Sequence, residues 1–326
     1  MNKTVTIVSC VIFAALLLGY NSRVFSVELF GLFKMNGSTA EDLKRIRDFN
    51  PDSDMFYLPD LGDKEFFESV DDLSICRRSE VREHLYTYLT SGREYVKKSI
   101  ERSYYYMPVI TAILKEHPDI PEEIALLPLL ESGFNPEAVS RSKAVGLWQF
   151  LSGTSSRLGL RNDQWTDERR DIEKSTTAAI RHLRYLYKRF GSWDLALAAY
   201  NGGCGQVGRA MDRTGAKDFW SLRENGALSN ETSQYVPRFA ALVIIYRNRR
   251  LSGLSGELNI PRPAATENVQ VNTPVTTGEL CRICNVNMEV IRRYNPELKT
   301  GVIPSYSGTY TLRLPEESLK YWNEYF

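Results

Sequence analysis

One stretch constrains the fold of this chain more than any other: residues 119–133, with the sequence DIPEEIALLPLLESG. Its apolar residues recur at helical spacing, which predicts a helix with one apolar face, capped by Asp119. Pro128 lies inside the pattern and should bend this helix rather than end it. Glu131 follows Ile124 by about two helical turns and projects from the same face if the bend is modest. The stretch therefore predicts a carboxyl group at the end of an apolar surface.

The position of Glu131 suggests a chemical role. Contact with apolar neighbours disfavours the charged carboxylate and raises its pKa. A carboxyl group that keeps its proton near neutral pH can act as a general acid. A single glutamate at a helix end is more often a surface residue, so the chemical interpretation depends on motifs elsewhere in the chain.

The length and composition exclude several classes of function. A chain of 326 residues with ordinary apolar and charged fractions should form two or three domains. Its formal net charge of +1 provides no overall basic field for nucleic acid. The chain has 3 histidines, His84, His117 and His182, and their spacing is not that of metal ligands. The sequence therefore predicts no metal, no cofactor and no nucleic-acid partner.

Residues 1–26 are typical of a signal peptide or a membrane anchor. Lys3 precedes a nearly unbroken apolar run over residues 5–18, which is short for a spanning helix of about 20 residues. Residues 24–26 offer a weak cleavage site, and an uncleaved anchor in the inner or outer membrane is the alternative. With either interpretation the protein is exported, so we expect it in the periplasm or cell envelope.

Composition and periodicity divide the rest of the chain into domains. Helical spacing dominates up to residue 250, with a break at 91–92 and a stop at Gly191. A stretch of serine, glycine and proline without a helical period then indicates a linker. After it, a strand, two helices and a second strand are predicted. The predicted segments are an irregular, partly helical region at 27–78, a helical domain at 79–250, the linker at 251–267, a compact module at 268–316 and a helical tail at 317–326.

The cysteines bear on the redox chemistry of the chain. Cys10 lies in the N-terminal segment, which leaves Cys76, Cys204, Cys281 and Cys284. An exported protein can pair some of them as disulfides. The Cys281–Cys284 spacing resembles half of a zinc or redox site, but no second half follows. A buried or disulfide role is the preferred interpretation, and the pairing stays open.

Glu131 belongs to the first of several short motifs in the helical domain. They are Glu131-Ser132, Gly146-Leu-Trp148-Gln149, Ala199-Tyr200-Asn201-Gly202-Gly203 and Glu231-Thr-Ser-Gln-Tyr235-Val236-Pro237. In this order they resemble the lysozyme-like lytic transglycosylases, and most closely the type D membrane-bound murein transglycosylases. Residues 280–296 and 310–315 resemble a lysin motif, a small module that binds peptidoglycan. The resemblance implies a mainly α protein, with a goose-type lysozyme-like catalytic domain and a small βααβ lysin-motif-like C-terminal domain.

The resemblance also implies that Glu131 is the catalytic residue of a peptidoglycan lytic transglycosylase. Such enzymes cleave the β-1,4 bond between N-acetylmuramic acid and N-acetylglucosamine in glycan strands. Glu131 would first protonate the leaving oxygen, because breaking a glycosidic bond needs a neutral carboxyl. The substrate's acetamido group would stabilise the sugar cation, and Glu131 would then act as base while the muramic C6 hydroxyl attacks C1. A 1,6-anhydro ring forms and no water is consumed.

Other matched positions are candidates for substrate binding. They are Ser140, Trp148, Gln149, Tyr200, Asn201 and Tyr235. The serine and the glutamine offer hydrogen bonds to the sugar and its N-acetyl group. Tyr200 and Asn201 are expected at the floor of the cleft, and Tyr235 is expected to orient the acid or the acetamido group. Packing or helix capping is the alternative for each of them, and Trp148 is evenly balanced between the cleft wall and the core.

Two other functions stay open. A hydrolytic lysozyme of the same fold would need a base for water near Asp163 to Asp171, but the acids from Asp163 to Glu173 are interpreted as a solvated, helix-starting segment. A non-catalytic wall-binding protein would not need the intact set of motifs. Product mass separates the two enzymes, because the anhydro product is one water lighter. The separate module also predicts that deleting residues 268–326 weakens sacculus binding and largely spares cleavage of short glycans.

Overall fold

The computed structural model describes residues 78–249, 254, 258–259, 265–273, 275–304 and 309–325. The predicted signal or anchor at 1–26, the region at 27–77 and most of the predicted linker lie outside these residues, as does Cys76. In the described part, no helix is long and apolar enough to span a membrane. Ile75–Val243 and Asn259–Phe326 form one compact unit, so the helical domain and the C-terminal module belong to a single body.

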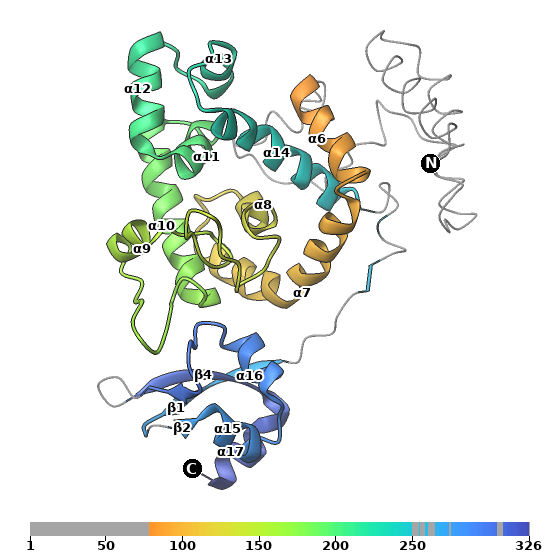
Figure 1. Cartoon of the computed structure of the whole chain (residues 1–326), viewed down its shortest axis with the longest axis vertical. Helices are drawn as coiled ribbons and strands as arrows, with labels where there is room; N and C mark the ends of the chain where they lie inside the picture. The colour runs from red at the N-terminus through yellow and green to blue at the C-terminus, as the bar shows by residue number, and fades with distance from the viewer. Residues whose placement is uncertain are drawn as a thin grey trace, which may run out of the picture. The chain divides into compact units, whose positions relative to one another are not determined.

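The helical domain consists almost entirely of helices, as its periodicity predicts (Figure 1). Its longer helices are α6 (Ser79–Leu89), α7 (Arg93–Lys115), α10 (Ile172–Phe190), α11 (Trp193–Gly202), α12 (Cys204–Thr214) and α14 (Asn230–Arg247). The shorter elements are the 3₁₀ helix η1 (Glu122–Leu126) and the helices α8 (Leu127–Glu131), α9 (Ser152–Arg157) and α13 (Phe219–Glu224). The mainly α class is thereby confirmed.

Local chemistry sets the ends of the two central helices. Asp171 accepts a hydrogen bond from the amide of Lys174 at the start of α10 (2.9 Å). Ser192 accepts one from the amide of Leu195 at the start of α11 (3.3 Å). Gly191 ends α10 in the left-handed region, with φ of 78°, which glycine adopts without a Cβ clash. The predicted stop at this glycine is confirmed, and α10 and α11 pack against each other beyond it.

The stretch at 119–131 departs from the predicted single bent helix. It splits into η1 and α8, and Pro128 is the second residue of α8. Proline has no N–H to continue the hydrogen-bond ladder, so a new helix starts there. Asp119 is not a cap, because its carboxylate pairs with Arg184 of α10 (2.6 Å). The buried apolar face is confirmed, since Ile124 is fully buried.

Helix α8 lies inside the domain, and Figure 1 shows it surrounded by α7, α10, α11 and α14. Arg102 of α7 fixes the chain just after α8 by donating from Nε to the carbonyl oxygen of Gly133 (2.7 Å). Gly133 has φ of 59°, and a Cβ there would lie 2.6 Å from the Ser99 hydroxyl oxygen. The close approach of α7 therefore requires glycine, and it holds Glu131, the last residue of α8, in place.

The C-terminal module has the predicted βααβ order. Strand β1 (Thr266–Val271) pairs antiparallel with β4 (Tyr310–Pro315), with Val269 opposite Leu312. Between them in the chain lie α15 (Thr277–Ile283) and α16 (Met288–Tyr294). Two further strands, β2 (Val275–Thr276) and β3 (Val302–Ile303), also pair, and they are too short to give a sequence period. The tail forms η3 (Glu316–Ser318) and α17 (Leu319–Tyr325), as its helical pattern predicts.

The module has its own apolar core, which includes one of its cysteines. Leu280, Ile291 and Leu312 are buried in it together with Cys284, and Cys281 packs against them. Both thiols are free. The interpretation of Cys284 as a buried residue is therefore confirmed, while no disulfide joins it to Cys281.

Candidate active site

Glu131 meets a tyrosine from a distant part of the chain at the end of α8. The hydroxyl of Tyr235, on α14, donates a hydrogen bond to Glu131 Oε1. Tyr235 is 3% exposed, whereas Glu131 is only partly buried. The tyrosine therefore fixes one carboxylate oxygen from the protein side, as expected for a residue that orients the acid.

The surroundings of Glu131 raise its pKa to about 7. The largest cause is burial, which disfavours the charged form. The hydrogen bond from Tyr235 and the positive charge of Arg238 act in the opposite direction, and the negative charge of Glu231 adds to the rise. Near neutral pH a large fraction of this carboxyl therefore keeps its proton, which is the state a general acid needs.

Tyr200, at the end of α11, faces the same carboxyl. Burial and the charge of Glu131 raise the pKa of Tyr200 well above its ordinary value, so the phenol keeps its proton. Its hydroxyl donates to the carbonyl oxygen of Trp148 (2.6 Å). This contact ties α11 to the segment around Trp148, and the place of Tyr200 at the floor of a cleft stays a prediction.

A short hairpin at residues 139–150 carries the glycine and glutamine of the second motif. Val145 bridges both Val139 and Phe150 in it. Gly146 has φ of 87°, and a Cβ there would lie 1.9 Å from the carbonyl oxygen of Arg169, so no other residue fits. The main chain of the hairpin thus lies directly against that of Arg169, and Gly146 is needed for that contact.

Ser140 and Gln149 both make hydrogen bonds within the hairpin. The Ser140 hydroxyl accepts from the amide of Ala144 (3.0 Å). Gln149 Nε2 donates to the carbonyl oxygens of Gly146 (2.8 Å) and Ala138 (3.3 Å). Gln149 also has φ of 49°, which is a strained backbone for a residue with a side chain. The structural role foreseen as the alternative is present for both residues.

Trp148 lies in the core, not on a cleft wall. Its side chain is fully buried, and its indole N–H donates to the hydroxyl of Thr176 on α10 (3.0 Å). The expected contact with substrate is therefore corrected, because the ring has no exposed face. Its contribution to the site is the main-chain carbonyl that accepts from Tyr200.

Asn201 belongs to a polar network between α11 and α14. Its Nδ2 donates to Glu231 Oε1 (3.2 Å), and its Oδ1 accepts from the hydroxyl of Thr232 (2.9 Å). This network was not predicted, although both partners lie in the last motif. Arg238, which acts on the pKa of Glu131, was also missed. Its position one helical turn after Tyr235 was the available signal.

The acids after the hairpin are not the solvated segment that their charge pattern suggests. Asp167 and Asp171 are 4% and 3% exposed. Asp167 pairs with Arg169 (2.7 Å), and Asp171 lies 3.3 Å from the guanidinium of Arg313. A charge pattern normally indicates surface, but a carboxylate with an arginine partner can be buried.

The remaining acids of this segment are also occupied. Asp163 Oδ1 accepts from the amides of Trp165 (2.8 Å) and Thr166 (2.9 Å). Glu168 pairs with Lys174 (2.6 Å). Among the residues that the structure describes, no cluster of histidine, cysteine and acidic side chains is arranged to hold a metal ion.

Two family models match segments of this chain. Residues 108–223 match the Transglycosylase SLT domain, and residues 265–325 match the LysM-like domain of the lytic transglycosylase MltD. The helical segment with Glu131 therefore belongs to the SLT transglycosylase class, and the βααβ module belongs to the LysM-like class.

Individual relatives narrow this class. The chain is 32% identical over 248 residues to the membrane-bound lytic murein transglycosylase D of Escherichia coli strain K12. The aligned region covers 74% of this chain and 53% of the relative. The values are the same for the relative from E. coli O6:H1 strain CFT073. The peptidoglycan transglycosylase gp16 of Escherichia phage T7 is 37% identical over 99 residues, 29% of this chain and 8% of that protein. The resemblance to type D murein transglycosylases is confirmed, and the chain spans about half the length of the E. coli relatives.

Proposed function

We propose that this protein is a peptidoglycan lytic transglycosylase that uses Glu131 first as acid and then as base. The observation that carries the proposal is a partly exposed carboxyl with a pKa of about 7, held by Tyr235 within a domain of the SLT transglycosylase class. The substrate is the β-1,4 bond between N-acetylmuramic acid and N-acetylglucosamine, as the relatives named murein transglycosylases suggest.

The reaction needs one proton that leaves and returns. Glu131 gives its proton to the glycosidic oxygen, and the bond between that oxygen and C1 of the muramic residue breaks. The substrate's acetamido group stabilises the cation at C1, so no second protein carboxylate is required. The C6 hydroxyl then bonds to C1 and passes its proton to the Glu131 carboxylate. The 1,6-anhydro end forms, and Tyr235 stabilises the carboxylate between the two steps.

The neighbouring residues have narrower roles in this proposal. The Gln149 side chain uses its amide nitrogen within the hairpin, so its amide oxygen is the atom that would accept from the N-acetyl group. Ser140 would act from the start of the hairpin turn. Tyr200 and Asn201 would form the floor of the cleft, each held by a hydrogen bond to the protein.

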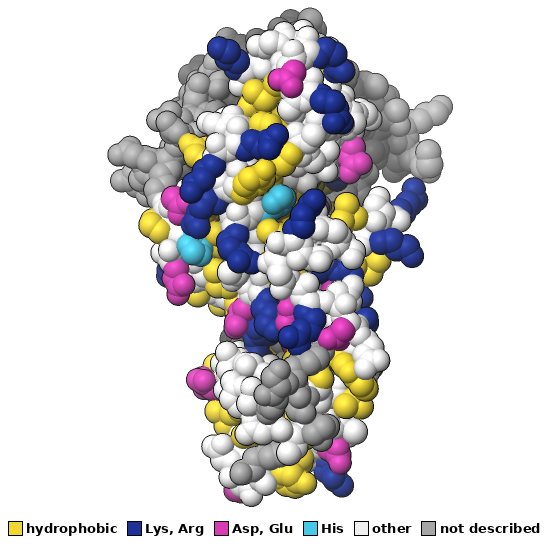
Figure 2. Space-filling view, turned by 90° about the vertical axis from the view of Figure 1, so that its left-hand side faces the viewer, with side chains coloured by type: hydrophobic (Ala, Val, Ile, Leu, Met, Phe, Trp, Pro, Cys, Tyr) yellow, Lys and Arg dark blue, Asp and Glu magenta, His cyan; other side chains and the backbone are white. Residues whose placement is uncertain are grey.

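One face of the helical domain suits an anionic polymer. Figure 2 shows Lys and Arg side chains around a strip of hydrophobic ones on the face that carries α9, α10 and α12. On α10, Arg181 and Lys188 are exposed, and Tyr185 is 51% exposed. Peptidoglycan offers sugar rings for aromatic contact and carboxylates for cations. We infer from this and from the LysM-like module that the protein acts on glycan strands in the cell envelope, after export and with or without membrane attachment.

Hydrolysis by a lysozyme of the same fold is less well supported. It would require a free carboxylate to activate water. The candidate acids for that role, from Asp163 to Asp171, are each engaged by an amide, a lysine or an arginine. A purely wall-binding protein would have no use for a partly buried acid of raised pKa at the end of this helix.

Product mass tests the proposal directly. Purified sacculi are digested with the wild-type protein and with Glu131→Gln, and the soluble fragments are analysed by mass spectrometry. We expect wild-type fragments one water lighter than hydrolysed muropeptides, and almost none from the variant. Hydrolysed fragments would instead indicate a hydrolytic lysozyme. Full activity of Glu131→Gln would show that another residue is the acid.

A further inference from the structure

The C-terminal module is bonded to the helical domain through main-chain atoms. The amide of Asp167 donates to the carbonyl oxygen of Glu297 (2.8 Å), and the amide of Lys299 donates to that of Trp165 (2.8 Å). Between these bonds, Thr166 forms an antiparallel bridge with Leu298. The loop at 161–171 thus pairs with the module as one β-strand pairs with another. A domain attached only through a linker would not need these bonds.

A buried arginine of the module adds a charged contact. Arg313 of β4 is 8% exposed, and its guanidinium lies 3.3 Å from Asp171 and 3.1 Å from Glu173. Asp171 is also the cap of α10. Removing the arginine would leave the buried Asp171 carboxylate without its cation, which destabilises a protein strongly. Arg313 therefore joins the module to the start of α10.

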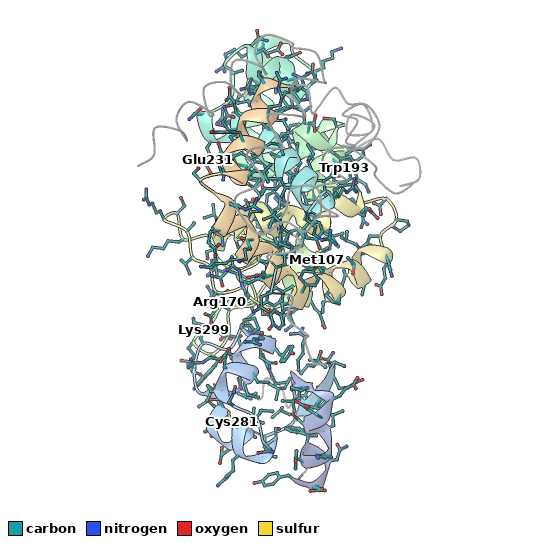
Figure 3. The ribbon with its side chains drawn as sticks, turned by 90° about the vertical axis from the view of Figure 1, so that its right-hand side faces the viewer. Met107, Arg170, Trp193, Glu231, Cys281 and Lys299 are labelled. Atoms are coloured by element: carbon teal, nitrogen blue, oxygen red, sulfur yellow. The ribbon has the colours of Figure 1, made fainter. Side chains whose placement is uncertain are left out.

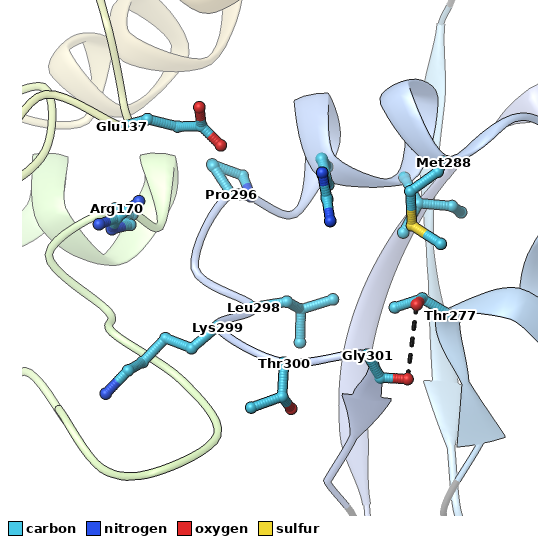
Figure 4. Close-up of a pocket in the computed structure, with 11 residues that line it drawn as sticks. Glu137, Arg170, Thr277, Met288, Pro296, Leu298, Lys299, Thr300 and Gly301 are labelled. Atoms are coloured by element: carbon cyan, nitrogen blue, oxygen red, sulfur yellow. Dashed lines mark hydrogen bonds between the residues drawn. The ribbon is translucent and has the colours of Figure 1, made fainter.

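The junction also contains a pocket beside two of its basic residues. Figure 3 shows Arg170 of the helical domain and Lys299 of the module close together. A pocket of about 400 Å³ opens beside them, lined from one side by Glu137 and Arg170 and from the other by Thr277, α16 and the loop after α16 (Figure 4).

The loop at 161–171 also supports the hairpin of the active site. Arg169 is 7% exposed and holds Asp167 through two bonds, Nε to Oδ1 (2.8 Å) and Nη2 to Oδ2 (2.7 Å). Its Nη1 donates to the carbonyl oxygens of Phe150 (3.3 Å) and Lys143 (3.4 Å). The hairpin is therefore held by the residue that fixes Asp167, and the amide of Asp167 is bonded to the module.

The hairpin in turn touches the neighbours of the acid. The carbonyl oxygen of Trp148 accepts from Tyr200, and that of Leu147 accepts from the hydroxyl of Ser132, the residue next to Glu131 (3.0 Å). Hydrogen bonds and short stretches of main chain thus lead from the module through the loop and the hairpin to Ser132, the residue next to Glu131.

We propose that the C-terminal module is a positioning element of the active site, which holds the hairpin at 139–150 through the loop at 161–171. The inference rests on the proposed function for its activity measurement. It reverses the expectation that the module could be deleted with little effect on short glycans. Arg313, Asp167 and Arg169 are positioning residues in this arrangement, since none of them has to touch substrate.

Two substitutions test the proposal from opposite sides of the junction. Arg313→Met removes the buried cation, and Glu173→Lys places a positive charge opposite Arg313 while leaving the module unchanged. Arg282→Met, on the exposed side of α15, and Thr177→Lys, one turn further along α10, are the matched controls. Full-length proteins are assayed on a short soluble glycan, with hydrogen exchange of the amides of residues 145–150 measured in parallel.

We expect kcat to fall on the order of tenfold, because a small displacement near an acid lowers the rate. KM should rise by a smaller factor, since Ser140 and Gln149 stay on a hairpin that shifts and does not unfold. Exchange of the hairpin amides should rise in both variants and in neither control. If Arg313→Met does not fold, Glu173→Lys decides. A folded Glu173→Lys with wild-type kcat and wild-type exchange would overturn the proposal. If Glu131→Gln stays active, the proposed function fails, and the exchange data alone still decide whether the module holds the hairpin.

Discussion

Glu131 and Glu297 are two glutamates with similar surroundings that differ in their exposure to solvent. Each carboxyl accepts a hydrogen bond from a tyrosine, Tyr235 and Tyr310 respectively, and burial raises the pKa of each. Glu297 is 1% exposed and enclosed within the module, whereas Glu131 ends a helix and is partly open. A raised pKa therefore reports burial, and catalysis on a polymer also requires a face that the polymer can reach.

Replacing each glutamate with glutamine should give the largest difference in activity between the two positions. Glu131→Gln should slow the digestion of sacculi by about a thousandfold, because general acid–base catalysis contributes on the order of a hundredfold to ten-thousandfold. Glu297→Gln should slow it by less than about fivefold, since its bond to the loop uses the main-chain carbonyl. Release of soluble fragments measures both, and similar losses in the two variants would remove the distinction.

The pH dependence should follow Glu131 alone. Activity requires its protonated form, so kcat/KM should decline as pH rises through about 7. Beyond that point the decline should approach roughly tenfold per pH unit. Glu297→Gln should show the same decline at the same pH. A wild-type decline centred near pH 4 would mean that the acid is not buried in solution.

Removing the hydroxyl of Tyr235 or of Tyr310 tests the difference between the two glutamates in a second way. The hydrogen bond from Tyr235 lowers the pKa of Glu131, so Tyr235→Phe should raise that pKa and move the alkaline decline to higher pH. The rate at pH 6 should fall by about tenfold, because the acid loses its fixed orientation. Tyr310→Phe should leave the position of the decline unchanged. The measurement is the same pH profile, and a shift toward lower pH in Tyr235→Phe would contradict the assigned contact.

The smallest effect concerns stability and belongs to Glu297. Its pKa is raised in the folded protein by burial and then by the charge of Asp171. Stability is therefore fully present below the ordinary value of 4.5 and is lost as pH rises through the folded pKa. Glu297→Gln cannot ionise, so its free energy of unfolding relative to wild type should increase between pH 5 and pH 8. Urea unfolding at both pH values measures this, and an equal difference at the two would refute it.

Features set by near neighbours were predictable from the sequence. The cap at Ser192 and the glycine stop at Gly191 depend on residues within four positions, and both are present. The apolar stripe that ends at Glu131 is also local, which is why the acid could be located. Two local predictions in this stretch were wrong: Pro128 starts a helix instead of bending one, and Asp119 is not a cap.

Features set by distant partners were not predictable from spacing. Asp171 and Arg313 lie 142 positions apart, so nothing near Asp171 in the sequence indicates that its charge is neutralised. Trp148 faces the same limit, because its burial depends on Thr176 of another helix. The pairing of Tyr235 with Glu131 was suggested by the family motifs and not by any periodicity.

Helix α14 carries three side chains that act on the pKa of Glu131: Glu231 raises it, while Tyr235 and Arg238 lower it. Their spacing of four and three residues places them on one side of a single helix. Adaptation to acidic or alkaline surroundings therefore does not require a new acid or a rebuilt cleft. A few substitutions along that one surface would suffice to change the pKa of Glu131, and with it the pH range of the proposed reaction.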